Sequence, residues 1–408
     1  MDLQNRIEKY AELIIKTGLA IKKDDVLVIR IPVENYEFGH ILAKKAFEQG
    51  AKDVKFNYRD QDFSVIKFKY ASEEVLKDIP QYFIDEQNHY VDTNCKFISV
   101  IGEDPNGLKD SDPDKVMIAN KASREALKHF SAEMMRNKVS WCVVGVPTKA
   151  WAKIVFPDLE EDKAVEKLWN MILDTSRVGE DPEKNWEEHI SSMKKHSKFL
   201  NENEFEYLHV TSSNGTDLKI GLPEGYIFQG CGEGNLRGER FVANIPTEEV
   251  FSMPHKDKVD GIVYASKPLN YNGSLIENFW FKFENGKVVD FHAKKGHDVL
   301  KNMLSMDEGA THLGEVALVP YDSPISNTKI LFYETLYDEN ASCHLALGKA
   351  YPTCIEGGPD MSEEELRAHG VNDSMIHVDF MFGYKDSHIV GVKKDGTKVD
   401  VFVNGNWA

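Results

Sequence analysis

Several features that define large classes of protein are absent from this sequence. Its 408 residues include only five cysteines and no CxxC pair, which argues against a disulfide framework. No stretch is continuously apolar over the length that a membrane span needs. Residues 1–19 carry charges throughout, with Ile7, Leu13 and Ile14 at helical spacing, and therefore predict an amphipathic helix in place of a signal peptide. We expect a cytoplasmic protein with reduced thiols.

Basic residues are also fewer than acidic residues. The chain has 49 lysines and arginines against 67 aspartates and glutamates, a formal net charge of −18. Such a chain repels polyanions at long range, so we expect neither nucleic acid nor an anionic membrane as a partner. The negative charge is compatible with a cationic substrate.

Familiar catalytic signatures are missing as well. The sequence contains no GxSxG elbow and no HExxH helix, so it gives no support to a serine hydrolase or a zincin. QGCGEGN (229–235) does not have the spacing of a dinucleotide-binding turn. DPNGLKDSDPDK (104–115) has neither the glycine nor the final glutamate of an EF-hand loop. We interpret both segments as loops.

The first half of the chain alternates strand and helix signals. Residues 35–51 predict a helix closed by Gly50, and 164–200 predict two further helices. Apolar runs that read as buried strands lie at 24–32, 52–59, 94–102 and 138–147. This alternation indicates an α/β domain with a mostly parallel sheet and crossover helices.

The second half changes to hairpin signals. Four dipeptides that favour tight turns sit between alternating apolar runs: Asn214-Gly215, Asn272-Gly273, Asn285-Gly286 and Asp395-Gly396. The sequence therefore predicts an α+β domain dominated by antiparallel strands. We place the boundary near residue 203, which gives an N-terminal α/β domain, 1–203, and a C-terminal domain, 204–408.

Ionisable residues interrupt apolar runs in four segments of this second half. The segments are IPTEEVFSMPH (245–255), GATHLGEVALVP (309–320), ENASCHLALGKAY (339–351) and MIHVDF (375–380). In the last of them, strand alternation places His377 and Asp379 on one face and Val378 and Phe380 on the other. Each ionisable residue taken singly has a structural interpretation, as a solvated strand residue, a strand-end carboxylate or a satisfied core histidine.

Their joint occurrence favours a metal site, because a buried carboxylate is costly unless it is paired or bound to metal. Oxygen and nitrogen donors together suit zinc, cobalt or manganese. Five ligands, three of them carboxylates that can bridge, exceed the needs of one tetrahedral ion and point to two. The candidate ligands are Glu249, Glu315, His344, His377 and Asp379.

The segments PTEEVF, LGEVALVP, ENASCHLALGKAY and HVDFM resemble the signature segments of the thermophilic aminopeptidase family, the aminopeptidase T and aminopeptidase S type of two-metal exopeptidases. The resemblance implies that the five candidates are metal ligands, with Glu249 chosen over Glu248 because it directly precedes Val-Phe. It implies that Tyr351 is catalytic, that the C-terminal domain carries the site, and that the protein is a homodimer. The ions would be zinc, cobalt, manganese or magnesium.

The hypothesis is therefore a metal-dependent aminopeptidase that acts on peptides with a free N-terminus. Glu315 or Glu249 would accept a proton from the attacking water, and Tyr351 would donate a hydrogen bond to the oxyanion. Two alternatives stay open. The protein could be a metal-dependent hydrolase of another amide or ester, or a non-catalytic binding protein that metal stabilises.

Overall fold

The computed structural model describes residues 2–271 and 274–408. Contacts within the chain group the residues into two compact units. Unit 1 contains the residues up to Glu188 together with Gly232–Pro246, and unit 2 contains His189–Cys231 together with Thr247–Ala408. The boundary near residue 203 stays a prediction, because grouping by contact does not test which segments fold as domains.

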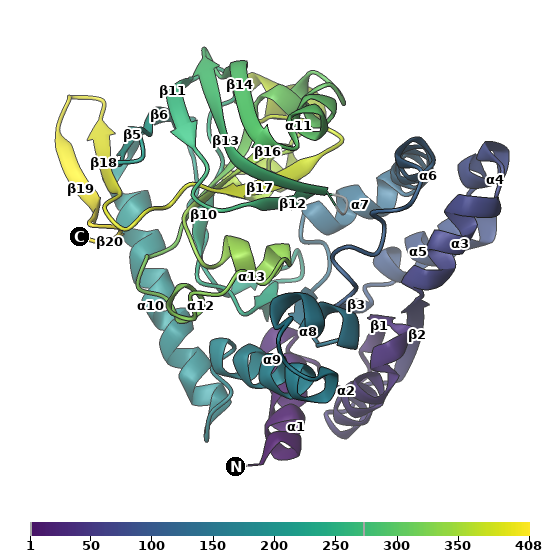
Figure 1. Ribbon diagram of the computed structural model, residues 1–408. Coiled ribbons are helices and arrows are strands. Elements are labelled where there is room, and N and C mark those ends of the chain that lie inside the picture. The colour runs from purple at the N-terminus through teal and green to yellow at the C-terminus, as the bar shows by residue number, and fades with distance from the viewer. Residues whose placement is uncertain (1, 272–273) are drawn as a thin grey trace. The chain divides into compact units, whose positions relative to one another are not determined.

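Unit 1 is built on a five-stranded parallel sheet with strand order β2-β1-β3-β4-β9 (Figure 1). Its strands are β1 (Val26–Pro32), β2 (Asp53–Arg59), β3 (Lys96–Ile101), β4 (Trp141–Gly145) and β9 (Asn244–Ile245). The predicted parallel sheet is confirmed. Two short strands of this unit, β7 (Glu233–Gly234) and β8 (Arg240–Phe241), pair with each other.

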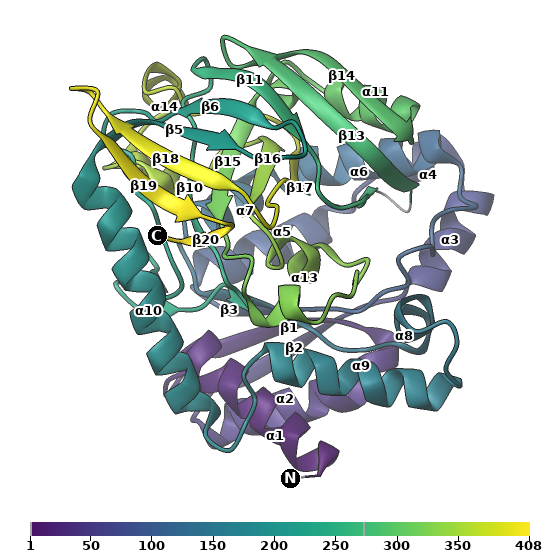
Figure 2. The same cartoon turned by 60° about the vertical axis from the view of Figure 1, so that its left-hand side comes forward.

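Helices cover both faces of this sheet (Figure 2). On one face, Tyr10 of α1 stacks on Phe38 of α2, which in turn contacts Trp169 of α9. On the other face, Val91 of α5 and Phe130 of α7 pack with strand residues in one buried cluster. The helices are α1 (Leu3–Leu13), α2 (Tyr36–Glu48), α3 (Gln61–Tyr70), α4 (Glu73–Lys77), α5 (Gln81–Asp92), α6 (Pro113–Ala126), α7 (Lys128–Met135), α8 (Lys149–Val155), α9 (Glu161–Thr175) and α10 (Pro182–Asn203), the last continuing into unit 2.

Unit 2 contains a nine-stranded antiparallel sheet with strand order β12-β13-β11-β6-β5-β18-β19-β20, in which β14 also pairs with β13. The predicted turns at Asn214-Gly215, Asn285-Gly286 and Asp395-Gly396 each join two of its strands. The predicted turn at Asn272-Gly273 lies outside the described residues. The strands are β5 (Phe205–Thr211), β6 (Asp217–Gly221), β11 (Val259–Tyr264), β12 (Leu269–Tyr271), β13 (Ser274–Glu284), β14 (Lys287–Lys295), β18 (His388–Lys393), β19 (Lys398–Val403) and β20 (Asn406–Trp407).

A second antiparallel sheet of unit 2 has four strands in the order β10-β15-β16-β17 (Figure 2). They are β10 (Val250–Ser252), β15 (Leu313–Leu318), β16 (His344–Gly348) and β17 (His377–Met381). Phe380 of β17 packs against Phe279 and Phe281 of β13, with ring centroids 6.0 and 5.0 Å apart. This aromatic contact joins one face of the small sheet to the large one.

The described residues of unit 2 also form four short α-helices. They are α11 (His297–Leu304), α12 (Pro324–Asn327), α13 (Thr335–Glu339) and α14 (Glu363–Ala368). Within the described ranges, no helix of either unit is long and apolar enough to cross a membrane.

Candidate metal centre

The other face of the four-stranded sheet carries the ionisable residues. In the strand register, Glu315 of β15 lies opposite Ala346 of β16, and Ala346 lies opposite Asp379 of β17. His344 and His377 follow the same alternation and share that face with them. Glu249 directly precedes β10, at the other edge of the sheet. All five predicted ligands therefore meet on one sheet.

Glu315 lies between the two histidines. Its Oε1 is 3.4 Å from His344 Nε2, and its Oε2 is 3.6 Å from His377 Nε2. His344 Nε2 also lies 2.9 Å from Glu249 Oε2, and His377 Nε2 lies 3.6 Å from Asp379 Oδ1. These five residues, the candidate metal centre, form two donor groups that share Glu315: Glu249, Glu315 and His344 in one, and Glu315, His377 and Asp379 in the other. In each group the donor atoms lie within 4.8 Å of one another.

The neighbouring Glu248 faces elsewhere. Its Oε2 lies 4.0 Å from His189 Nε2, and its backbone N–H donates to Asn340 Oδ1 at 2.7 Å. Both Glu248 and Glu249 are buried. The structure thus brings Glu249, and not Glu248, to His344.

Backbone carbonyls fix the orientation of both imidazoles. His344 Nδ1 lies 3.0 Å from the carbonyl oxygen of Glu339 and 3.1 Å from that of Ser342. His377 Nδ1 lies 2.7 Å from the carbonyl oxygen of Lys349. A carbonyl can only accept, so each Nδ1 carries the proton and each Nε2 is directed at the carboxylates. This outer support is the arrangement that orients histidine ligands in metal sites.

The charges of the centre are strongly coupled. Burial alone would lower the pKa of His344, but its hydrogen bonds to Glu249 and Glu315 raise that pKa well above its usual value. Burial likewise opposes the charge of His377, whose pKa Asp379 and Glu315 raise to about 10. Burial raises the pKa of Glu315 despite the hydrogen bond from His344. In the absence of another cation, protons on the histidines are therefore the counter-charge for the carboxylates.

One observation tests whether these residues fit a metal ion. Asp379 Oδ1 is buried and accepts no hydrogen bond from the part of the chain that the structure describes. A buried carboxylate oxygen without a donor is costly, and a divalent cation satisfies it. Three carboxylates, and two imidazoles whose Nε2 atoms face them, also form a donor set suited to such ions. The residues fit the metal that the sequence predicts.

Two small residues lie among the donors of the centre. Ala346 separates Glu315 from Asp379 in the strand register, and Gly348 lies opposite His377. Gly348 has a φ of 105°, and a Cβ there would lie 2.1 Å from the carbonyl oxygen of Ile376. Only glycine fits at that position, where the chain passes close to β17.

Tyr351 lies beside the candidate metal centre, packed in a cluster that includes Met253 and Cys354. Its ring meets that of His377 edge-on, with the centroids 5.3 Å apart. Burial and the negative charges of Glu315 and Asp379 raise the pKa of its hydroxyl well above the usual value. The phenol therefore keeps its proton at neutral pH.

Glu339, the last residue of α13, was missed by the sequence analysis. Burial, followed by the charges of Asp379 and Glu249, raises the pKa of its carboxyl well above the usual value. In ENASCHLALGKAY the predicted site residues are His344 and Tyr351, although Glu339 opens the same segment. The signal that could have identified Glu339 is an acidic residue at the end of a helix, just before an apolar strand.

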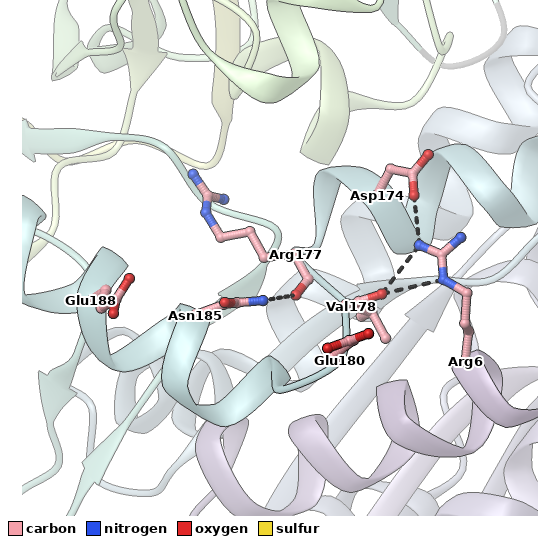
Figure 3. A pocket seen from close by; sticks show the side chains of 8 residues that line it. Arg6, Asp174, Arg177, Val178, Glu180, Asn185 and Glu188 are labelled. Carbon is pink, nitrogen blue, oxygen red and sulfur yellow. Dashed lines mark hydrogen bonds and ion pairs between the residues drawn. The ribbon is translucent and has the colours of Figure 1, made fainter. Parts of the chain in front are cut away.

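Unit 1 contains a separate pocket of about 600 Å³ (Figure 3). Arg6 Nη2 pairs there with Asp174 Oδ1 at 2.6 Å and donates to the carbonyl oxygen of Val178 at 3.2 Å. The residues that line it include none of the predicted site residues. We assign no ligand to this pocket.

Residues 3–407 of the chain match the thermophilic metalloprotease family (M29). Together with the donor set described above, this match defines a metal-dependent peptide hydrolase, and the predicted enzyme class is confirmed. The chain belongs to the M29 thermophilic metalloprotease family.

Individual relatives agree with this assignment. Aminopeptidase 2 of Geobacillus stearothermophilus is 43% identical over 406 residues, 99% of this chain and 98% of its own. Aminopeptidase T of Thermus aquaticus is 39% identical over 402 residues, 98% of either chain. The solved structure of wild-type AmpT from Thermus thermophilus has a TM-score of 0.93 at 37% identity and covers 100% of both chains. The predicted fold class and the resemblance to the aminopeptidase T and S type are confirmed.

Filling the space beside Ala346 should prevent metal binding. We expect Ala346→Leu to lose bound divalent metal, because the larger side chain would stand between Glu315 and Asp379. Mass spectrometry measures the metal content, and circular dichroism checks that the variant is folded. Ala346→Ser, which adds a single oxygen, is the control and should keep its metal. A folded Ala346→Leu protein with normal metal content would contradict the claim that metal binding needs the space beside Ala346.

Metal uptake at neutral pH should release protons. His344 and His377 are protonated in the metal-free centre, with a pKa of about 10 for His377, and a cation must displace those protons. The apparent metal affinity should therefore rise with pH up to about 10, where His377 loses its proton in the metal-free centre. Calorimetry in buffers of different ionisation enthalpy counts the protons, and His377→Ala should release fewer than the wild type. Metal binding without proton release would contradict the protonation assigned to the histidines.

Proposed function

We propose that this protein is an aminopeptidase that removes N-terminal residues from peptides at a centre of two divalent ions. One observation carries the two-ion proposal: the two oxygens of Glu315 face different histidines, each with its own further carboxylate. A carboxylate placed in this way can bridge two ions. The names of the relatives as aminopeptidases support the exopeptidase activity.

Each ion would have its own set of ligands. Glu249 and His344 would hold one ion, His377 and Asp379 the other, and Glu315 both. When bound, such ions supply a water of lowered pKa and polarise the carbonyl group of the scissile bond. We propose zinc, cobalt or manganese, because these ions accept mixed carboxylate and imidazole ligands, and magnesium on the family resemblance alone.

Residues of the chain would move the protons. Glu315 or Glu249 would accept the proton of the attacking water and pass it to the leaving amine, since both carboxylates lie within the donor groups. Tyr351 keeps its proton at neutral pH and would donate a hydrogen bond to the oxyanion that forms at the scissile carbonyl. The hydrolysis then balances, because the water supplies hydroxyl to the new carboxyl end and a proton to the amine.

The proposed cellular location, oligomeric state and catalytic domain follow the family resemblance. We propose that the protein acts in the cytoplasm as a homodimer and that the residues from 204 onward form its catalytic domain. All five proposed ligands and Tyr351 lie in unit 2, which supports that assignment. The net charge of −18 supports peptide substrates with a cationic N-terminus over polyanionic partners.

Release of p-nitroaniline from leucine p-nitroanilide tests the proposed function. We expect activity that EDTA abolishes and that zinc, cobalt, manganese or magnesium restores. Acylated amides and esters are the comparison substrates. Their hydrolysis in place of the anilide would favour the other hydrolase, and a folded protein inactive with every ion would favour the binding protein.

Tyr351→Phe tests the role of the phenol. The variant should keep its metal and its fold, because no proposed ligand changes. Its kcat should fall by roughly 100-fold, as expected when one donor to an oxyanion is removed. Metal analysis and steady-state kinetics measure both. Wild-type turnover in the variant would remove Tyr351 from the mechanism.

A further inference from the structure

Tyr351, the proposed donor to the oxyanion, makes few directional contacts of its own. A donor stabilises an oxyanion best when it is already oriented, because no reorganisation is then needed during the reaction. The Tyr351 hydroxyl forms no hydrogen bond with residues 2–271 or 274–408, and this leaves it available to a substrate. The orientation of the phenol therefore depends on the contacts of its ring.

Two aromatic rings contact the ring of Tyr351. The imidazole of His377 has its centroid 5.3 Å away, at an interplanar angle of 74°. The ring of Phe251 has its centroid 6.0 Å away, at an interplanar angle of 65°. Both contacts are edge-to-face, an arrangement that aromatic pairs prefer. Because His377 is already a proposed ligand, Phe251 is the contact whose role the metal site does not explain.

The strand register places Phe251 on the same sheet face as the candidate metal centre. Phe251 of β10 lies opposite Ala317 of β15, and Ala317 lies opposite His344 of β16. Ala317 follows Glu315 by two residues, so strand alternation directs both side chains to one face. The half-buried ring of Phe251 therefore borders the donors, although it has no atom that binds a metal ion.

The backbone of Phe251 is held in place by a neighbouring segment. Its N–H donates to the carbonyl oxygen of Gln229 at 2.9 Å, and its own carbonyl oxygen accepts from the N–H of Gln229 at 2.8 Å. The side chain of Gln229 donates to the carbonyl oxygen of Thr353, two residues after Tyr351. Gln229 thus links the strand that carries Phe251 to the segment that carries Tyr351.

We propose that Phe251 is a positioning residue, which holds the ring of Tyr351 where its hydroxyl donates to the oxyanion of the transition state. This inference rests on the proposed aminopeptidase function and on the role of Tyr351 in it. A smaller, non-aromatic side chain at this position would remove the edge-to-face contact and leave space into which the phenol turns. The loss would slow turnover and not weaken substrate binding, because the oxyanion forms only during the reaction.

A double-mutant cycle in the metal-loaded protein tests this inference. The four proteins are the wild type, Phe251→Leu, Tyr351→Phe and the variant with both substitutions, assayed with leucine p-nitroanilide. We expect Phe251→Leu to lower kcat roughly 10-fold, near the upper end of the range for one aromatic pair, and to leave KM unchanged. When Tyr351→Phe is already present, Phe251→Leu should lower kcat no further, because the hydroxyl that it positions is gone.

Two further variants separate positioning from stability. Phe251→Tyr keeps an aromatic ring and should retain more of the turnover than Phe251→Leu does. Phe291→Leu is the matched control and should leave kcat unchanged, because Phe291 is also half-buried and stacks on a histidine, His297, but lies on β14. Mass spectrometry and circular dichroism should show wild-type metal content and fold in every variant.

An equal fall in kcat with and without Tyr351→Phe would overturn the positioning role of Phe251. So would wild-type turnover in Phe251→Leu, loss of its metal, or a fall as large in Phe251→Tyr. None of these results would affect the aminopeptidase proposal, which is tested by the cleavage of leucine p-nitroanilide by the wild type. An inactive wild type would overturn both.

Discussion

The site depends on one electrostatic constraint, namely that three carboxylates are buried on a sheet face and that, among the described residues, two histidines are the cations that face them. Glu249, Glu315 and Asp379 cannot all be ionised there without a counter-charge, and the histidines supply it only while they hold protons. Even then, Asp379 Oδ1 has no donor in the described part of the chain. Divalent cations resolve this conflict, because they replace the protons and satisfy the oxygens at once.

The rest of unit 2 holds this unfavourable arrangement of charges in place. One face of the four-stranded sheet is fixed by Phe380 against β13, so the ionisable residues on the other face cannot turn away. Carbonyl groups of Glu339 and Lys349 hold the imidazoles in one orientation. Ala346, which lies between Glu315 and Asp379 in the strand register, leaves space between these two donors. Packing therefore stabilises unit 2, and the buried carboxylates still require cations as counter-charges.

The alternation along β17 made part of this site predictable. His377 and Asp379 had to share a face once residues 375–380 were taken as a strand, and Phe380 had to lie on the other. The parallel sheet and three of the hairpins were predictable for similar reasons, since periodicity and turn residues are local signals. The choice of Glu249 over Glu248 came from the family resemblance, because both are buried and adjacent.

Features that depend on contacts between distant segments could not be predicted. The position of Ala346 between Glu315 and Asp379 depends on the register of three strands that come from separate parts of the chain. Glu339 reaches the site through the end of a five-residue helix, which has too few residues for a periodic signal. The grouping of Gly232–Pro246 with unit 1 involves strands of two residues, and these show no alternation either.

Counting the ions bound per chain tests the central claim most directly. Protein dialysed against zinc or cobalt would be analysed by mass spectrometry, as wild type, Glu249→Ala, Asp379→Ala and Glu315→Ala. If Glu315 serves both donor groups, the wild type should bind two ions, and Glu315→Ala should lose more metal than either variant in which only one group is changed. A wild type that saturates with one ion, or a Glu315→Ala protein that keeps both, would contradict the account.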